Sequence, residues 1–173
     1  MGPGTVNVVP HSHYPTRDSR WAAIACTNDK IFARLAEVMG RPDLAQPDTW
    51  GTIAARERDR AQVDETVSAW TATMDRADLL AKCEAAQVPC GPVYAIDEIF
   101  QDPHYAAREN ILRMDDPRMG SLAVPNLIPR LTETPGRVNW LGVPLGSHNI
   151  EVYQGCLGLS DKEMARLRDE GVI

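Results

Sequence analysis

The stretch over residues 87–94, with the sequence QVPCGPVY, constrains the fold of this chain more than any other segment. Pro89, Gly91 and Pro92 lie within it, directly after a run over residues 75–86 that has helical spacing. Because proline lacks an amide hydrogen and restricts the residue before it, the helix must end here. The extended residues 91–94 predict a short strand, and a new helix is predicted from Asp97.

A β-hairpin and several amphipathic helices are predicted before this junction. Residues 14–24 predict the hairpin, with turn chemistry at residues 16–19 and a short apolar strand over residues 21–26. The next helix is capped by Thr27 or Asn28 and is followed by Gly40. Its apolar face is formed by Ile31, Phe32, Leu35, Val38 and Met39. Two further helices are predicted over residues 63–74 and 76–86.

A strongly charged stretch over residues 53–62 contains the sequence ARERDRAQ. Runs of this kind usually form solvated helix faces or loops. We therefore predict a solvated helix or loop there.

In the second half of the chain, the sequence predicts one more hairpin and a long irregular segment. Residues 111–114 and 121–124 are apolar or alternating on either side of a turn, which predicts two strands. Together with residues 21–26 and 91–94 they predict one small mixed sheet. Repeated proline and glycine over residues 125–146 predict an extended arm laid over another surface. Ser160 and Glu163 form a capping-box pattern that predicts a final helix.

These elements define the predicted fold class and domain organisation. The class is α/β in the α+β sense: a small domain with a short mixed sheet and several helices, then a proline-rich C-terminal arm that ends in a helix. We place the small domain at residues 1–124. The arm and the C-terminal helices occupy residues 125–173 and would pack on a large domain or on a partner chain.

Charge and composition exclude some classes of partner and location. A formal net charge of −6 argues against nucleic acid, because phosphate binding needs a basic surface. The sequence contains neither a signal-peptide pattern at its start nor an apolar run long enough to span a membrane, so we expect a cytoplasmic protein with no membrane partner. The four cysteines are widely spaced, which predicts free thiols without a metal site or a disulfide framework.

Few residues stand out as candidates for chemistry, and common enzyme motifs such as a nucleotide-binding glycine loop or G-x-S-x-G are absent. His11 and His13 share one face of an extended segment, but they have no third ligand for a metal. Cys90 has no evident base beside it, so we interpret it as a packing residue. His148 and Glu151 lie at a loop-to-helix transition that could face a ligand, although ordinary helix capping explains the same residues.

These segments, in this order, resemble the class III CoA-transferase family, which includes formyl-CoA transferase, carnitine CoA-transferase and the 2-methylacyl-CoA racemases. The resemblance rests on HYPTRDSRWAAIACTND, FARLAEVMGRPDL, VPCGPVYAIDEIFQDPHY, PLGSHNIEVYQGCLGLS and the final EGVI. It extends from about Asn7 to Ile173. The chain would then be the small domain and the tail of such an enzyme.

The resemblance also implies a mechanism and a place for the substrate. In the family an aspartate of the large domain attacks the acyl-CoA thioester, becomes an acid anhydride and then an enzyme-bound CoA thioester, and passes CoA to a carboxylic acid. That aspartate lies upstream of every matching segment, so no catalytic residue is assigned here. The family's substrate loop corresponds to residues 7–14, which implies His11, Ser12, His13 and Tyr14 as substrate-binding residues. Many transferases are glycine-rich there, and this chain departs from that pattern.

Coenzyme A and acyl-CoA would be substrates, with no permanently bound cofactor and no metal. The implied partners are the acyl-CoA and carboxylic acid substrates, together with a second copy in a homodimer or an N-terminal large domain. On its own the chain would be inactive. Two alternatives stay open: racemisation of an acyl-CoA by proton exchange, and a non-catalytic assembly or binding module.

Overall fold

The structure is a computed structural model that describes residues 2–173, and it divides into two compact units. The first unit ends at Ile99, and the second runs from Phe100 to Ile173. The boundary predicted at residue 124 separates the small domain of a whole enzyme from its C-terminal arm. It stays a prediction.

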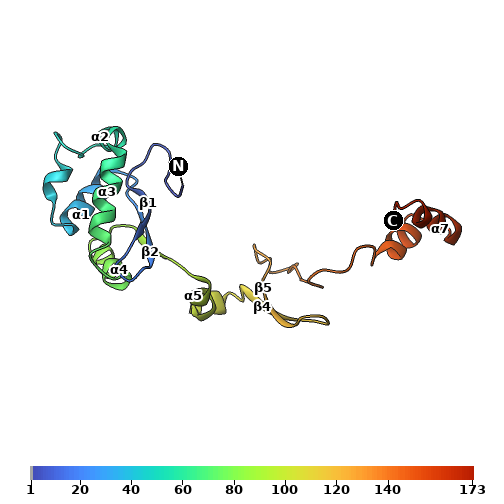
Figure 1. The fold of residues 1–173 in the computed structure, drawn as a ribbon. Coiled ribbons are helices and arrows are strands. Elements are labelled where there is room, and N and C mark those ends of the chain that lie inside the picture. The colour runs from blue at the N-terminus through green and yellow to red at the C-terminus, as the bar shows by residue number, and fades with distance from the viewer. Residues whose placement is uncertain (1) are drawn as a thin grey trace. The chain divides into compact units, whose positions relative to one another are not determined.

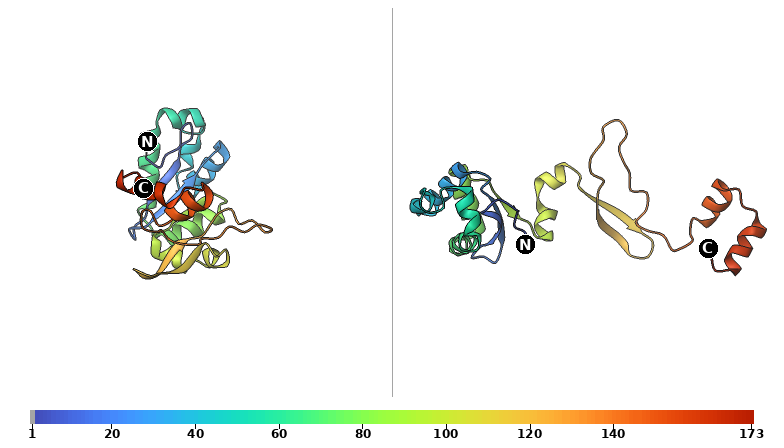
Figure 2. Two further views of the ribbon diagram at one scale, coloured as in Figure 1. Left: turned by 90° about the vertical axis from the view of Figure 1, so that its right-hand side faces the viewer. Right: turned by 90° about the horizontal axis from the view of Figure 1, so that it is seen from above.

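The first unit is a three-stranded antiparallel sheet with helices on one face (Figures 1 and 2). Its strands are β1 (His11–Pro15), β2 (Trp21–Ala25) and β3 (Cys90–Val93). Its helices are α1 (Asp29–Val38), the 3-10 helix η1 (Pro42–Ala45), α2 (Ile53–Arg58), α3 (Arg60–Thr71) and α4 (Arg76–Ala85). Helix α5 (Ile96–Gln101) carries the chain across the boundary between the units.

Local signals explain where several of these elements begin and end. The Asn28 side chain accepts a hydrogen bond from the Ile31 amide and caps α1, and Gly40 follows with a φ of 69°. The turn at Thr16 joins β1 to β2, with the Thr16 amide donating to the Arg20 carbonyl. The predicted hairpin, capped helix and strand after the junction are therefore confirmed.

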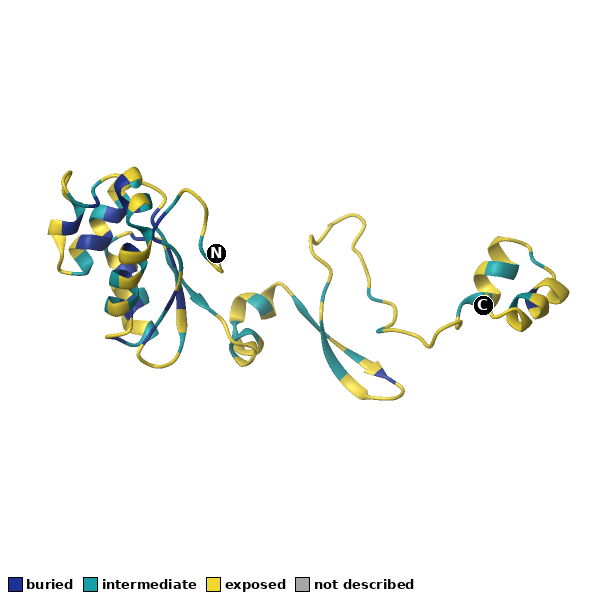
Figure 3. Ribbon diagram, turned by 45° about the horizontal axis from the view of Figure 1, so that its top comes forward, coloured by how far each residue is buried: buried dark blue, intermediate teal, exposed yellow. Residues whose placement is uncertain are grey.

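The core of the first unit lies between the sheet and its helices, where the buried residues of Figure 3 gather. Phe32 and Leu35 of α1, Val63 and Val67 of α3, and Leu79 of α4 are at most 2% exposed. Their spacing of three or four residues along each helix turns one side toward the sheet. Burial of these apolar side chains is the main stabilising contribution in this unit.

In the second unit two strands pair as a separate hairpin. Strands β4 (Ile111–Asp116) and β5 (Gly120–Pro125) are antiparallel and pair only with each other among the described residues. The Asp116 carboxylate accepts hydrogen bonds from the Arg118 and Met119 amides and closes the turn. The prediction of one mixed sheet is therefore wrong, because strand patterns in a sequence indicate which face is buried but not which strand lies beside which.

The remaining elements of the second unit are helical. They are α6 (Pro103–Ala107), the π-helix η2 (Ile150–Cys156) and α7 (Asp161–Asp169). Ser160 and Glu163 form the predicted capping box of α7. Residues 126–148 contain neither helix nor strand, as their prolines and glycines predict. That this segment lies over another surface stays a prediction.

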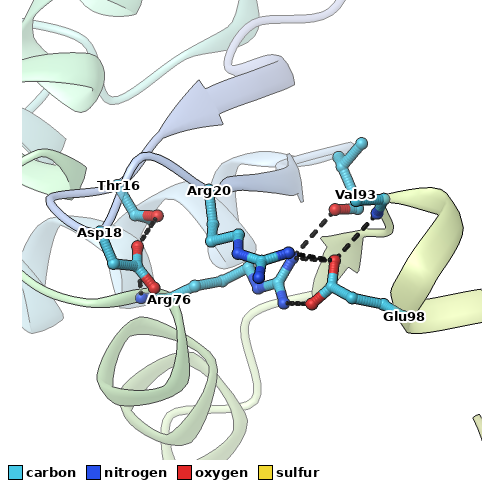
Figure 4. Close-up of polar contacts among 7 residues, drawn as sticks. Thr16, Asp18, Arg20, Arg76, Val93 and Glu98 are labelled. Atoms are coloured by element: carbon cyan, nitrogen blue, oxygen red, sulfur yellow. Dashed lines mark hydrogen bonds and ion pairs between the residues drawn. The ribbon is translucent and has the colours of Figure 1, made fainter. Parts of the chain in front are cut away.

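A cluster of ionic contacts holds the start of α5 on the first unit (Figure 4). The Arg76 guanidinium donates to the Val93 carbonyl at 2.9 Å and to both oxygens of the Glu98 carboxylate. Arg20 approaches Glu98 to 3.0 Å, and the Ala95 amide donates to it at 2.9 Å. With these donors the pKa of Glu98 falls to about 2, and the hydrogen bond from Arg76 is the main cause.

Glu98→Gln is expected to destabilise the first unit in a pH-dependent way. Because the folded-state pKa lies below the unfolded value, ionised Glu98 stabilises the fold above about pH 5, and this contribution disappears as the pH falls toward about 2. The urea midpoints of wild type and variant should therefore differ at pH 7 and converge at low pH. Glu84→Gln, at an exposed position of α4, is the matched control. A wild-type advantage that is the same at pH 7 and pH 3 would contradict the assignment.

Candidate functional site

Strand β1 presents its side chains alternately to the helices and to the opposite, open face of the sheet. Ser12 lies opposite Ile24 and Tyr14 opposite Ala22 in the pairing of β1 with β2. Ile24 and Ala22 are buried against the helices, and the Tyr14 hydroxyl donates to Asp64 of α3 at 2.6 Å. Burial, with that hydrogen bond, raises the pKa of Tyr14 far above its usual range. Ser12 and Tyr14 therefore belong to the helix-facing side.

His11 and His13 lie on the open face of the sheet. His11 is paired with Ala25 and His13 with Ala23, which in turn is paired with Gly91 of β3. These small neighbours leave room above the sheet beside the two imidazoles. His13 is exposed, whereas His11 is half-buried and its Nδ1 atom has no hydrogen-bond partner within residues 2–173. A buried polar atom without a partner is unusual and suits a position completed by a ligand or by another part of the protein.

Two arginines fix the segment that leads into β1. Arg56 donates from Nε to the Val9 carbonyl at 2.8 Å, and Arg60 donates from Nη1 to the Val8 carbonyl at 3.2 Å. Both carbonyls belong to backbone that has no strand partner of its own at this point. The guanidinium groups therefore determine how the chain enters the strand that carries His11.

Arg56 is fully buried, with 0% of its side chain exposed. It also donates to the Trp50 carbonyl at 2.8 Å and to Asp29 at 2.9 Å, and its guanidinium carbon lies 4.5 Å from the Phe32 ring centroid. Of the two predicted forms for the charged stretch, helix or loop, the structure shows helix. The expectation that the stretch is solvated is wrong at Arg56. Arginine suits such a site because its planar group donates in several fixed directions at once.

The other candidates from the sequence are spread over both units. Cys90 is half-buried on β3. His148 contacts the Trp140 ring, with the centroids 5.2 Å apart, and Glu151 is exposed. Strand β1 contains all four residues that the resemblance implied as substrate-binding. It divides them between the two faces of the sheet.

Three residues that shape this site were not singled out from the sequence: Arg56, Arg60 and Asp64. Arg56 and Arg60 belong to the charged stretch over residues 53–62, and Asp64 follows it two residues later. Charges in such a pattern resemble an ordinary solvated surface. The available signal was the pair Ala54-Ala55 before Arg56, because small apolar residues allow a helix to approach its neighbours closely.

The described part of the chain lacks both a metal-binding cluster and a membrane-spanning helix. Residues 2–173 contain no group of three histidine, cysteine or acidic side chains arranged to hold a metal ion. Within the same range no helix is long and apolar enough to cross a membrane.

Comparison with known proteins defines the family. The model of CoA-transferase family III matches residues 1–149. The succinyl-CoA–L-malate CoA-transferase alpha subunit of Chloroflexus aurantiacus is 42% identical over 172 residues, covering 99% of this chain and 40% of that protein. The formyl-CoA:oxalate CoA-transferase of Streptomyces avermitilis is 35% identical over 140 residues, and the match covers 80% of this chain and 34% of that protein.

A solved structure supports the same assignment. The chain resembles a CAIB/BAIF family protein from Brucella suis with a TM-score of 0.67 and 26% identity, covering 90% of this chain and 39% of that one. The chain belongs to CoA-transferase family III, a family of enzymes. It spans about 40% of the length of the first curated relatives that it matches. The resemblance inferred from the sequence motifs is confirmed.

Proposed function

We propose that this chain is the small domain and tail of a class III CoA-transferase that moves CoA between an acyl-CoA and a carboxylic acid. The observation that carries the proposal is the 42% identity to a CoA-transferase subunit along 99% of the chain. The nucleophile would be an aspartate in the part of the relatives that this chain does not match. Its carboxylate would become an anhydride and then a CoA thioester, which divides one difficult step into easier ones.

The names of the relatives support a dicarboxylic acid as acceptor. They name succinate or its CoA thioester, malate, citramalate, oxalate and glutarate as partners in CoA transfer. Such an acid carries a second carboxylate besides the one that receives CoA. Imidazole N–H groups donate hydrogen bonds to carboxylates, and they bind more strongly when the ring is protonated. We assign this recognition to His11 and His13 on the open face, with Ser12 and Tyr14 holding the strand in place.

The second unit supports the proposal that the tail packs on a further part of the enzyme. Exposed apolar side chains follow one another along the irregular segment: Leu127, Ile128, Leu131, Trp140, Val143 and Leu145. Leu145 is fully exposed, and Ile128 is 74% exposed. Apolar side chains in such number are usually covered in a functional assembly. The large domain, in the same polypeptide or in a second copy, is the partner that we propose for this segment.

An activity assay with two forms of the protein tests the proposal. A longer protein that joins this chain to a large domain of the family should transfer CoA from succinyl-CoA to L-malate, whereas the 173-residue chain alone should not. Transfer by the chain alone would overturn the assignment of the nucleophile. Proton exchange on a chiral 2-methylacyl-CoA without transfer to any acid would favour the racemase alternative.

Substitution of His13 tests the proposed substrate contact in that longer protein. His13→Ala should raise KM for the acid about ten- to a hundredfold, because a hydrogen bond to a charged group contributes about 1.5 to 3 kcal/mol. The exposed His104 of α6 serves as the matched control, and His104→Ala should leave KM unchanged. An unchanged KM in His13→Ala would remove this residue from the site.

A further inference from the structure

Gly91 lies within strand β3, where nothing in the described part of the chain requires a glycine. Its pairing with Ala23 of β2 is in unbroken register, so it does not lie at a bulge. Its φ is outside the left-handed region that favours glycine. A Cβ atom added to Gly91 would meet no atom within 4 Å beyond its chain neighbours. Since glycine weakens the interior of a strand, the reason for it here lies outside the packing of the first unit.

Gly91 continues a row of small residues that begins beside His13 on the open face of the sheet. His13 pairs with Ala23, and Ala23 pairs with Gly91. Directly opposite residues of an antiparallel sheet point to the same face. Neighbouring strands lie about 4.8 Å apart, so the row reaches about 10 Å from His13. Beyond His13 it presents the methyl group of Ala23 and then the bare backbone of Gly91.

The two histidines indicate what kind of group comes close to this row. A glycine inside a strand often marks the close approach of a ligand or of another backbone. His13 is exposed, and the buried Nδ1 atom of His11 has no hydrogen-bond partner among the described residues. Imidazole N–H groups donate to carboxylates. Because the histidines lie beside one end of the row, an acid that they bind would extend its carbon chain over Ala23 and Gly91.

We propose that Gly91 is a specificity-determining residue, whose missing side chain leaves space for the carbon chain of a dicarboxylic acid. The inference rests on the proposed function, in which His11 and His13 bind that acid. One carboxylate is held at the imidazoles, and the acid runs over Ala23 toward β3, against the backbone of Gly91. A side chain at position 91 would occupy this space, so its size limits how large an acid the open face accepts.

Substitution of Gly91 in the longer protein that joins this chain to a large domain tests the proposal. Gly91→Ala should raise KM for L-malate about tenfold, and Gly91→Val should raise it further, because one methylene group of misfit changes kcat/KM about ten- to two-hundredfold. Kd for L-malate, measured by isothermal titration calorimetry, should rise in the same order.

Gly155 of η2 provides the matched control. Its φ is likewise outside the left-handed region, and a Cβ atom added there also meets no atom within 4 Å beyond its chain neighbours and helix backbone. Gly155→Ala should leave KM and Kd for L-malate within about twofold of wild type.

The stability of the 173-residue chain separates a role in binding the acid from a role in the fold. Because the added methyl group meets no neighbour, Gly91→Ala should unfold at the same urea concentration as wild type or at a higher one. A lower urea midpoint would show that the fold requires this glycine and would overturn the proposal.

The behaviour of the longer wild-type protein distinguishes this inference from the proposed function. If wild type transfers CoA and Gly91→Ala leaves KM for L-malate unchanged, only the role of Gly91 is overturned. If wild type binds L-malate without transferring CoA, weaker binding by Gly91→Ala supports the role of Gly91 without the proposed reaction, and equal binding overturns it. A wild type that neither transfers CoA nor binds L-malate would overturn both.

Discussion

Arg56→Ala is expected to lower the free energy of unfolding of the first unit by about 3 to 4 kcal/mol, because each buried carbonyl left without a donor costs about 1 to 3 kcal/mol. The Val9 and Trp50 carbonyls lose their partner, and the Phe32 ring loses the guanidinium packed over it. Asp29 contributes less, since its side chain is 50% exposed and water replaces the lost contact. Urea denaturation followed by circular dichroism measures the difference.

Two variants show whether the geometry of Arg56 or only its charge matters. Arg56→Lys keeps the charge but not the planar set of donors, so it should fall between wild type and alanine. Arg58 lies two residues later on the same helix and is 69% exposed, so Arg58→Ala should stay within about 0.5 kcal/mol of wild type. A similar small change in Arg56→Ala would show that the buried contacts do not stabilise the unit.

Phe32→Ala should lower the free energy of unfolding by about 3 to 5 kcal/mol, the range found when a buried phenylalanine is truncated. Phe32 is 1% exposed and packs in the core between α1 and its neighbours. Its removal leaves a cavity and also takes away the ring beneath Arg56. The same denaturation measurement applies.

The chain contains one other phenylalanine, which provides a matched control. Phe100 is 47% exposed, so Phe100→Ala should change stability far less than Phe32→Ala. The double variant Phe32→Ala/Arg56→Ala should be less destabilised than the sum of the single variants, because the contact between the two side chains is counted twice in that sum. Full additivity would contradict the contact between Arg56 and Phe32.

These two residues connect the stability of the core to the proposed site. Phe32 supports Arg56, and Arg56 holds the Val9 carbonyl just before His11. A partial loss of this support should disturb the start of β1 before the whole unit unfolds. Within a longer enzyme, Arg56→Lys is therefore expected to affect KM for the acid more than Arg58→Ala does.

Local elements and the family followed from the sequence. The cap at Asn28, the capping box at Ser160 and Glu163, and the helix stop before Pro89 depend on residues only a few positions apart. Because these hydrogen bonds join residues that are close in the sequence, short-range patterns predict them. The motifs that carry the resemblance are likewise contiguous segments, and comparison with known proteins confirmed the family that they indicated.

Contacts between distant residues were decided by the tertiary structure alone. Alternation along β1 separates His11 and His13 from Ser12 and Tyr14, but only the packing of α3 shows which pair faces the helices. A charged run is solvated unless the fold surrounds it, and Arg56 is surrounded because Val9, Trp50, Asp29 and Phe32 converge on it. The junction QVPCGPVY marked a strand, whereas the pairing of that strand, β3, with β2 was decided by the tertiary structure. Burial and proximity depend on which elements meet in space, and local sequence does not encode that.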